Sequence, residues 1–270
     1  MVYRPEAKFA DMNTLKNILD SHAHYDDEAF DGDRDLLLSE LQQNGICNVV
    51  NCGVDLKASE ASIAMAAKYP FLYAAVGIHP ECAKDAPQDY LEQLEKLITQ
   101  DKVVAVGEIG LDYHFEDNAP REVQKSIFEN QISLAQKYKL PIIVHDRDAH
   151  GDTMELLLKW KPAGVVHCFS GSVEMAKEVI RLGMYIGLGG AVTFKNARVP
   201  VEVAAFIPLE RMLMETDCPY MAPVPFRGKR NDSKLIAYTA TRIAEIRGTT
   251  PEQILEATRH NAETLFGIKR

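Results

Sequence analysis

The sequence predicts a (β/α)8 TIM barrel, an α/β fold in which eight parallel strands alternate with eight helices. Short runs rich in β-branched residues recur along the chain, and an amphipathic segment follows each of them. The length of 270 residues suits one such barrel. A doubly wound open sheet is the weaker alternative, because no GxGxxG motif follows the first run and the chain has no P-loop. One further amphipathic segment predicts an extra C-terminal helix.

The predicted strands are nearly continuously apolar where they begin, a pattern typical of parallel strands buried on both faces. They cover residues 17–24, 46–53, 71–80, 103–113, 140–148, 164–170, 184–190 and 211–220. Their carboxyl ends carry an unusual number of histidines and carboxylates. In a barrel these ends meet at one mouth, which is where such folds place their active sites.

The predicted helices carry apolar stripes with steps of three and four residues. They cover residues 33–44, 56–68, 88–99, 123–138, 152–160, 173–182, 200–207, 233–247 and 251–266. Gly or Pro stands where several of them should stop, at positions 45, 70, 183 and 248. We therefore expect one barrel domain over residues 17–270, preceded by an N-terminal extension over residues 1–16.

Composition narrows the class of protein. The chain has 30 Lys and Arg against 39 Asp and Glu, a net charge of −9, with 46% hydrophobic and 26% charged residues. These values are those of a globular protein and exclude disorder, collagen and coiled coil. The acidic balance argues against a broad basic face for nucleic acid. It leaves room for an enzyme that reaches phosphates through bound metal ions.

No apolar run approaches the roughly 20 residues that a membrane span needs, and the first 17 residues contain no apolar signal-peptide core. Five cysteines, an odd number with no CxxC motif, argue against a disulfide framework. We expect a soluble, cytoplasmic protein without membrane contact, in which the cysteines are small buried hydrophobic residues.

The first strand ends in Asp20-Ser21-His22-Ala23-His24. Strict alternation of side chains would place Asp20, His22 and His24 on one face. Two imidazoles that lie two residues apart on a strand can chelate one divalent cation. The other strand ends add Glu108 and Asp112 on a common face, His145, His167 and Asp217.

Each of these residues alone has an ordinary structural explanation, because a single strand-end His or Glu usually serves as a hydrogen-bonded group. Six of them at one end of a predicted barrel are harder to explain in that way. Unpaired buried carboxylates are costly, and metal coordination offsets that cost. The set of six comprises His22, His24, Glu108, His145, His167 and Asp217.

At this point the chain resembles the TatD family of metal-dependent deoxyribonucleases, within the amidohydrolase superfamily. The motifs run in family order from about residue 18 to residue 268. They are DSHAH (20–24), VGIHP (76–80), VGEIGLDYH (106–114), HDRDA (145–149), HCFSG (167–171), METDCPY (214–220) and PVPFRGKRN (223–231).

The resemblance implies a centre of two divalent metal ions, which could be Mg, Mn or Zn. His22, His24 and Asp217 would hold the first ion, Glu108 would bridge the two ions, and His145 and His167 would complete the second site. Divalent ions lower the pKa of water and make a nucleophile available at neutral pH. Asp217 is the expected general base, and Asp217 and Glu108 are the expected catalytic pair.

Residues that grip the substrate are expected in loops. Arg227, Lys229 and Arg230 form the densest basic cluster; a solvated charged loop is an equally good explanation on composition alone, and the family match favours phosphate contact. His79 could contact substrate or support a ligand. Arg147 could contact a phosphate or hold a carboxylate such as Asp20 or Asp112.

The leading hypothesis is therefore a metal-dependent DNase, a 3′-5′ exonuclease by family implication, that binds single-stranded DNA or 3′ ends transiently and needs no obligatory protein partner. The alternative is an amidohydrolase-superfamily enzyme that hydrolyses a small ester, amide or phosphoester. A catalytically silent barrel that serves as a binding scaffold is a third possibility, although it would not need all six polar positions.

Overall fold

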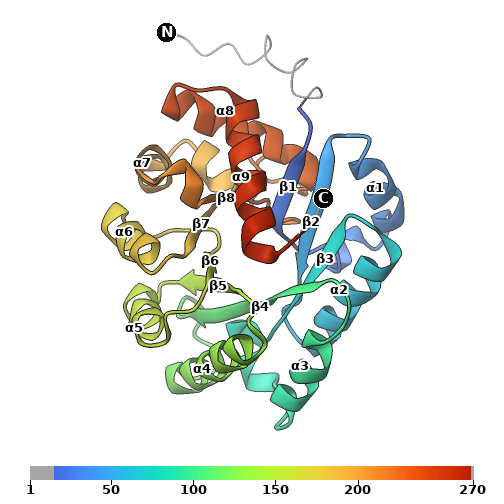
Figure 1. Cartoon of the computed structure of the whole chain (residues 1–270), viewed down its shortest axis with the longest axis vertical. Coiled ribbons are helices and arrows are strands. Elements are labelled where there is room, and N and C mark those ends of the chain that lie inside the picture. Colours follow the sequence, from blue (N-terminus) through green and yellow to red (C-terminus); the bar gives the residue numbers. More distant parts are fainter. Residues whose placement is uncertain (1–14, 269–270) are drawn as a thin grey trace.

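In the computed structural model, which describes residues 15–268, eight parallel strands form one sheet in the order β1 to β8. Helices surround the strands (Figure 1). The predicted (β/α)8 barrel is confirmed. The N-terminal extension predicted over residues 1–16 lies almost wholly outside the described residues.

The bounds of the elements follow the predicted ranges closely. The strands are β1 (Ile18–Ala23), β2 (Ile46–Cys52), β3 (Leu72–Val76), β4 (Val103–Asp112), β5 (Ile142–Arg147), β6 (Gly164–Val166), β7 (Tyr185–Leu188) and β8 (Met212–Met214). The helices are α1 (Arg34–Leu41), α2 (Leu56–Lys68), α3 (Tyr90–Ile98), α4 (Arg121–Tyr138), α5 (His150–Trp160), α6 (Val173–Arg181), α7 (Arg198–Phe206), α8 (Ile236–Arg247) and α9 (Pro251–Phe266).

Three strands end at least four residues earlier than their sequence runs suggested. β3 ends at Val76, β6 at Val166 and β8 at Met214, whereas the runs extend to residues 80, 170 and 220. The backbone of Cys168 has φ 42° and that of Asp217 has φ 58°, a left-handed conformation that cannot continue a strand. His79, His167 and Asp217 therefore lie just beyond the strand ends.

The ring is joined where β1 meets the segment after β8. Ala23 pairs with Cys218 in a parallel bridge. The amide of His24 donates to the carbonyl of Cys218 at 2.8 Å, and the amide of Asp217 donates to the carbonyl of His22 at 3.0 Å. Backbone pairing thus places His22 and His24 beside Asp217, the first and the last predicted metal ligands along the chain.

Successive side chains of a strand point to opposite faces of the sheet, and this alternation divides the apolar residues into two clusters. Val49 packs with the residues that face the helices, whereas its neighbour Val50 belongs to an inner cluster drawn from β1 to β6 and β8. Ala262, Phe266 and Ile268, from α9 and the residues after it, complete the inner cluster. In Figure 1, α9 lies across the ring of strands. The extra C-terminal helix therefore packs against the interior of the barrel.

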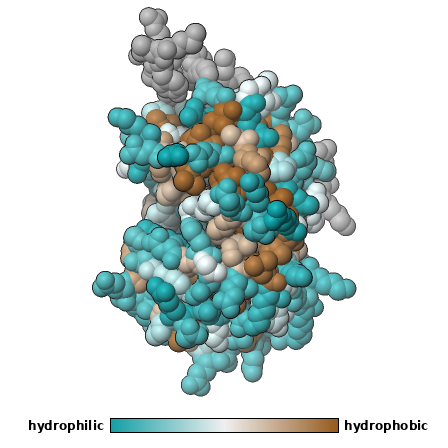
Figure 2. All heavy atoms as spheres, turned by 90° about the vertical axis from the view of Figure 1, so that its left-hand side faces the viewer, coloured by the Kyte–Doolittle hydropathy of each residue, from teal (hydrophilic) through white to brown (hydrophobic). Residues whose placement is uncertain are grey.

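The outer helices present a mainly hydrophilic surface that is interrupted by hydrophobic patches (Figure 2). Leu158 on α5 and Phe206 on α7 are about half exposed, at 48% and 47%. Within residues 15–268, no helix is both long enough and apolar enough to cross a membrane.

Candidate metal centre

The structure brings all six predicted metal ligands together at the carboxyl ends of the strands. They form overlapping groups of neighbouring donor atoms. Their side chains are mostly buried, with exposed fractions between 0% for His22 and 17% for His145 and Asp217. His79, which sequence reasoning had proposed for substrate contact, lies in one of these groups as well.

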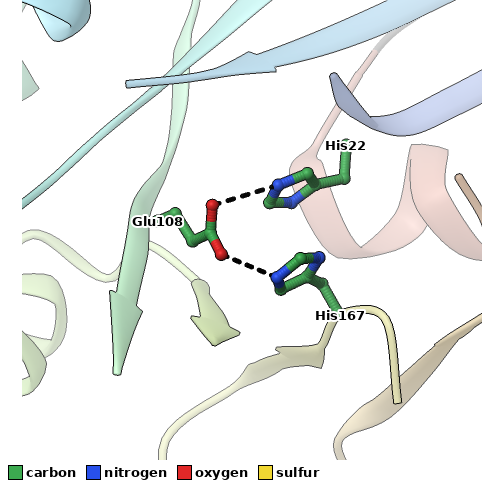
Figure 3. A group of neighbouring side chains, drawn as sticks. All are labelled: His22, Glu108 and His167. Carbon is green, nitrogen blue, oxygen red and sulfur yellow. Dashed lines mark ion pairs between the residues drawn. The ribbon is translucent and has the colours of Figure 1, made fainter. Parts of the chain in front are cut away.

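Glu108 occupies the middle of the cluster, and its two carboxylate oxygens face different imidazoles. Oε2 lies 3.2 Å from Nε2 of His22 and 3.4 Å from Nε2 of His24. Oε1 lies 2.7 Å from Nε2 of His167 and 2.9 Å from Nδ1 of His145. Figure 3 shows the carboxylate beside the rings of His22 and His167, with one oxygen directed to each; the two rings stack at 3.8 Å. Each oxygen therefore has its own set of nitrogen donors.

His22 on β1 and His24 just after it are oriented by β2. Nδ1 of His24 bonds to the carbonyl of Cys52 at 2.8 Å, and Nδ1 of His22 lies 3.5 Å from the Cys52 thiol. Their Nε2 atoms meet at 3.0 Å. Outer partners of this kind fix which ring nitrogen is turned to a metal.

Asp20 is not part of the cluster, contrary to strict alternation. Its carboxylate accepts hydrogen bonds from the Thr216 and Ser233 hydroxyls at 2.6 and 2.7 Å. The pairing of β1 with β2 is irregular between Asp20 and Ala23, and such an irregularity changes which face the following side chains occupy. Because burial opposes its ionised form, the pKa of Asp20 rises to about 6, although these hydrogen bonds work against the rise.

β4 has a matching irregularity between Val106 and Ile109, next to Glu108. Glu108 and Asp112 nevertheless both reach His145, as expected for side chains on a common face. Nε2 of His145 bonds to Asp112 at 3.0 Å while Nδ1 faces Glu108. Gly110 permits this approach, since a Cβ there would lie 2.0 Å from the carbonyl oxygen of His145.

Asp217 completes the first donor set. Its Oδ1 lies 3.7 Å from Nε2 of His22 and 3.5 Å from Nε2 of His24. Burial acts to raise the pKa of this carboxyl, but the hydrogen bond from His24 and the neighbouring imidazoles outweigh burial and lower it. Asp217 is therefore ionised at neutral pH and partly open to the cavity.

The electrostatics of the cluster centre on Glu108. Burial alone would raise its pKa, yet His167, His79 and His22 hold it well below 4.5. The reverse effect acts on His145, where the hydrogen bonds to Asp112 and Glu108 overcome burial and raise the pKa to about 10. At His22 burial outweighs the attraction of Glu108 and lowers the pKa to about 4. This imidazole is therefore neutral and able to bind a metal.

The donor atoms of the first set are spaced much as the ligands of one divalent ion are. Ligand atoms around one tetrahedral ion, at bond lengths of about 2.0–2.2 Å, lie about 3.3–3.6 Å from one another. The first set, which consists of His22, His24, Oε2 of Glu108 and Asp217, shows separations of 3.0–3.7 Å. The second set, of His79, His145 and His167 around Oε1, is more compact, with separations of 2.7–3.5 Å, because His167 and His145 lie at hydrogen-bond distance from Oε1.

The cluster forms the floor of a cavity of about 700 Å³. The walls come from the loops that follow the strands. The described residues lining the cavity are His24, Asp26, Asp27, Val54, His79, Glu81, Cys82, Glu108, Phe115, His145, Asp146, Arg147, His167, Cys168, Ser170, Asp217, Tyr220 and Met221.

The basic loop does not line this cavity. Arg230 instead forms a two-pronged ion pair with Asp33 at 2.6 and 2.7 Å, and the Arg227 guanidinium stacks over Phe194 at 3.9 Å. Lys229 is exposed outside the cavity lining. Contact of Arg227, Lys229 and Arg230 with substrate stays a prediction, and any such contact would lie beyond the cavity.

Sequence reasoning did not assign a role to Glu215, which is 1% exposed. Its Oε1 accepts a hydrogen bond from the amide of Cys168, and Nδ1 of His167 is 3.9 Å away. Among the described residues, Oε2 of Glu215 has no hydrogen-bond partner, and burial raises the pKa of this carboxyl to about 8. The sequence signal that could have identified Glu215 is its place in the METDCPY run, two residues before Asp217. No sequence pattern indicated that Phe115 and Tyr220 would lie at the rim of the cavity.

Comparison with known proteins agrees with this geometry. The family model described as TatD related DNase matches residues 19–267. The chain is 42% identical over 254 residues to the uncharacterized metal-dependent hydrolase YabD of Bacillus subtilis (strain 168), covering 93% of this chain and 99% of YabD. It is 33% identical to the 3′-5′ ssDNA/RNA exonuclease TatD of Citrobacter koseri, covering 87% of this chain and 94% of that protein.

Solved structures show the same likeness. The TatD homolog YjjV of Escherichia coli K12 superposes with a TM-score of 0.88 at 34% identity, covering 94% of this chain and 99% of YjjV. A TatD family hydrolase from Entamoeba histolytica superposes with a TM-score of 0.84 at 26% identity, covering 93% and 98% of the two chains. The chain therefore belongs to the TatD family of metal-dependent hydrolases.

Proposed function

We propose that this protein is a metal-dependent deoxyribonuclease that removes nucleotides from the 3′ end of single-stranded DNA and uses two divalent ions. The observation that carries the proposal is the position of Glu108, whose two oxygens each face a separate set of imidazoles. A carboxylate in this position is suited to bridge two ions. The name of the Citrobacter koseri relative supports nucleic acid as the substrate.

In this proposal His22, His24, Asp217 and Oε2 of Glu108 hold one ion. His145, His167 and Oε1 of Glu108 would hold the other, and His79 is close enough to contribute. Bound divalent ions, Mg, Mn or Zn, supply Lewis-acid charge to a phosphoryl oxygen and lower the pKa of water.

Asp217 is suited to accept the proton of the attacking water. Its carboxyl is ionised because the imidazoles lower its pKa, and at 17% exposure it is among the more accessible groups of the cluster. A general base must also lie within hydrogen-bond reach of the proton that it takes, and Asp217 lines the cavity that receives the substrate.

The size of the cavity favours action at a chain end. Its volume of about 700 Å³ falls within the range of about 300–1,000 Å³ that small-molecule sites occupy. A terminal nucleotide fits such a space.

The lining of the cavity also supports a second candidate function, hydrolysis of a small substrate. None of Arg227, Lys229 and Arg230 lines the cavity, while Asp26, Asp27 and Glu81 do. These features favour a small ester, amide or phosphoester over a polyanion, and they keep the small-substrate hydrolase as the alternative.

Hydrolysis of a single-stranded DNA oligonucleotide separates the two functions. The oligonucleotide is labelled at its 5′ end in one sample and at its 3′ end in another, and is incubated with Mg²⁺, Mn²⁺ or chelator. We expect a metal-dependent ladder from the 5′ label and immediate release of the 3′ label. Intact DNA under every metal condition, together with hydrolysis of nitrophenyl esters, would support the small-substrate enzyme instead.

The variant Asp217→Asn tests the proton acceptor in the same assay. Loss of a positioned general base should lower kcat by about 10²- to 10⁴-fold, while the circular dichroism spectrum stays that of the wild type. Near-normal turnover in this variant would remove Asp217 from the proposed role.

A further inference from the structure

Arg147 differs from the other basic residues near the centre. Among the described residues that line the cavity, it is the one Lys or Arg. It is exposed at the end of β5, and in the described part of the chain its guanidinium makes neither an ion pair nor a hydrogen bond. By contrast, Arg34 and Arg230 are bonded to carbonyls and carboxylates.

The carboxylates that Arg147 was expected to hold are satisfied elsewhere. Asp20 is bonded to Thr216 and Ser233. The Asp112 carboxylate is bonded to His145 and to the amide of His114. The charge of Arg147 is among the causes that lower the pKa of Asp112, but neither carboxylate forms an ion pair with the guanidinium, whose donors are available to a ligand.

An exposed aromatic ring holds this guanidinium in place. Arg147 lies over Phe115 at 4.9 Å, and Phe115 is 42% exposed although a ring of this size is normally buried, as Phe128 is at 0%. Phe115 also contacts the ring of His114, edge to face, at 5.0 Å. His114 in turn bonds to Asp148 at 2.8 Å. The Phe115–Arg147 pair is thus a supported platform at the rim of the cavity.

Other parts of the cavity lining carry negative charge. Asp26 and Asp27 follow β1, and Glu81 follows β3. Tyr220, 56% exposed, donates its hydroxyl hydrogen bond to Asp27 at 2.7 Å. A polyanion in the cavity would be repelled by these carboxylates and attracted to Arg147.

We propose that Phe115 and Arg147 form the subsite for one unpaired nucleotide of the substrate, in which the guanidinium binds a phosphate and the phenyl ring stacks on the base. The inference rests on the proposed nuclease function and names the part of the site that recognises the strand. Guanidinium groups suit phosphate oxygens, and aromatic side chains stack on bases without regard to sequence. Because a base must leave its duplex to stack on a side chain, this subsite selects single strands.

The test compares Arg147→Gln, Phe115→Ala and Phe115→Trp with the control Arg121→Gln. Arg121 also lies over an aromatic ring, that of Tyr113 at 4.2 Å, but it does not line the cavity. All are made in the Asp217→Asn background, and binding of a fluorescein-labelled hexadeoxynucleotide is measured by anisotropy at several salt concentrations.

We expect Arg147→Gln to raise Kd about tenfold and to reduce the slope of log Kd against log salt by about 0.7, the contribution of one phosphate contact on a single strand. Phe115→Ala should raise Kd about tenfold as well but leave the slope unchanged, and Phe115→Trp should restore binding. Arg121→Gln should bind as the parent does. Unchanged Kd and slope in both Arg147→Gln and Phe115→Ala would overturn the subsite.

Turnover in the otherwise wild-type background separates this inference from the proposed function. With Mn²⁺, each variant is assayed on the oligonucleotide and on bis(p-nitrophenyl) phosphate, which has no base to stack. The subsite requires a raised KM for the oligonucleotide alone. Equal losses on both substrates would assign Arg147 and Phe115 to support of the metal centre instead. Failure of the unsubstituted enzyme to bind or cut the oligonucleotide would refute the nuclease, and the subsite with it.

Discussion

The two ends of the barrel interior are built from the same strands but carry opposite chemistry. Towards α9 the interior is filled by apolar side chains such as Leu19, Val50 and Ile143, packed against Phe266. At the carboxyl ends the same strands turn imidazoles and carboxylates towards one another around Glu108. Both regions are almost completely buried. One end removes apolar surface from water, and the other holds charged groups away from water.

This contrast explains where stability and activity reside. Burial of apolar surface stabilises the fold at the α9 end, with about 25 cal/mol for each Å² removed from water. Buried carboxylates and imidazoles at the other end are costly unless they are paired or bind metal. We therefore expect changes near α9 to affect folding and changes around Glu108 to affect metal binding and turnover.

The largest expected effect comes from Glu108→Gln. The amide keeps the shape of the side chain but removes the charge that faces both sets of imidazoles. Because bound metal contributes several kcal/mol to stabilisation of the transition state, we expect a loss of at least about 10³-fold in kcat/KM. Metal content by mass spectrometry should fall in parallel. A variant that retains both metal and turnover would contradict the bridging role.

Phe266→Ala should lower stability and leave turnover nearly unchanged. The ring is 5% exposed within the inner apolar cluster, and removal of a buried Phe side chain costs about 3–5 kcal/mol of unfolding free energy. Urea unfolding measures this loss. At 15 °C, where the variant is still folded, we expect kcat within twofold of the wild type. A large loss of kcat in folded protein would show that the two ends are coupled.

Asn261→Ala should have a smaller effect of the same kind. The Asn261 side chain donates hydrogen bonds to the carbonyls of Leu209 and Met212 at 2.8 and 2.9 Å, which fastens α9 to the segment that enters β8. Because buried carbonyls lose their partners, we expect a loss of about 1–3 kcal/mol in unfolding free energy. The control Asn44→Ala removes an exposed bond to Glu40 and should change stability by less than about 0.5 kcal/mol.

Cys52→Ala tests a residue that lies between the apolar cluster and the metal centre. Its thiol packs in the inner apolar cluster and also lies 3.5 Å from Nδ1 of His22. Loss of this outer partner should weaken Zn²⁺ or Mn²⁺ binding about tenfold, as measured by titration calorimetry. Cys47→Ala is the matched control, because Cys47 lies on the same strand and its thiol contacts the carbonyl of Ile18. Equal metal affinity in the two variants would confine Cys52 to packing.

Local sequence predicted most of the fold. The helix limits at α2 and α9 agree with the predicted ranges, and α9 begins with Pro251 after the capping box of Thr250 and Gln253. The prediction for β1 was less successful on one point, since alternation placed Asp20 with His22. Pairing with β2 is irregular there, and a pairing irregularity depends on the neighbouring strand, which a local pattern does not describe.

The six residues of the candidate metal centre could be named from the sequence because the chemistry of buried His and Glu at strand ends is restrictive, and the barrel gathers those ends. The tertiary structure decided how they meet: which oxygen of Glu108 faces which imidazole, that His79 joins the second set, and that Arg147 rather than Arg230 lines the cavity. These relations join side chains 30 to 200 residues apart in the chain. They are set by strand register and loop packing, so no local pattern of residues could specify them.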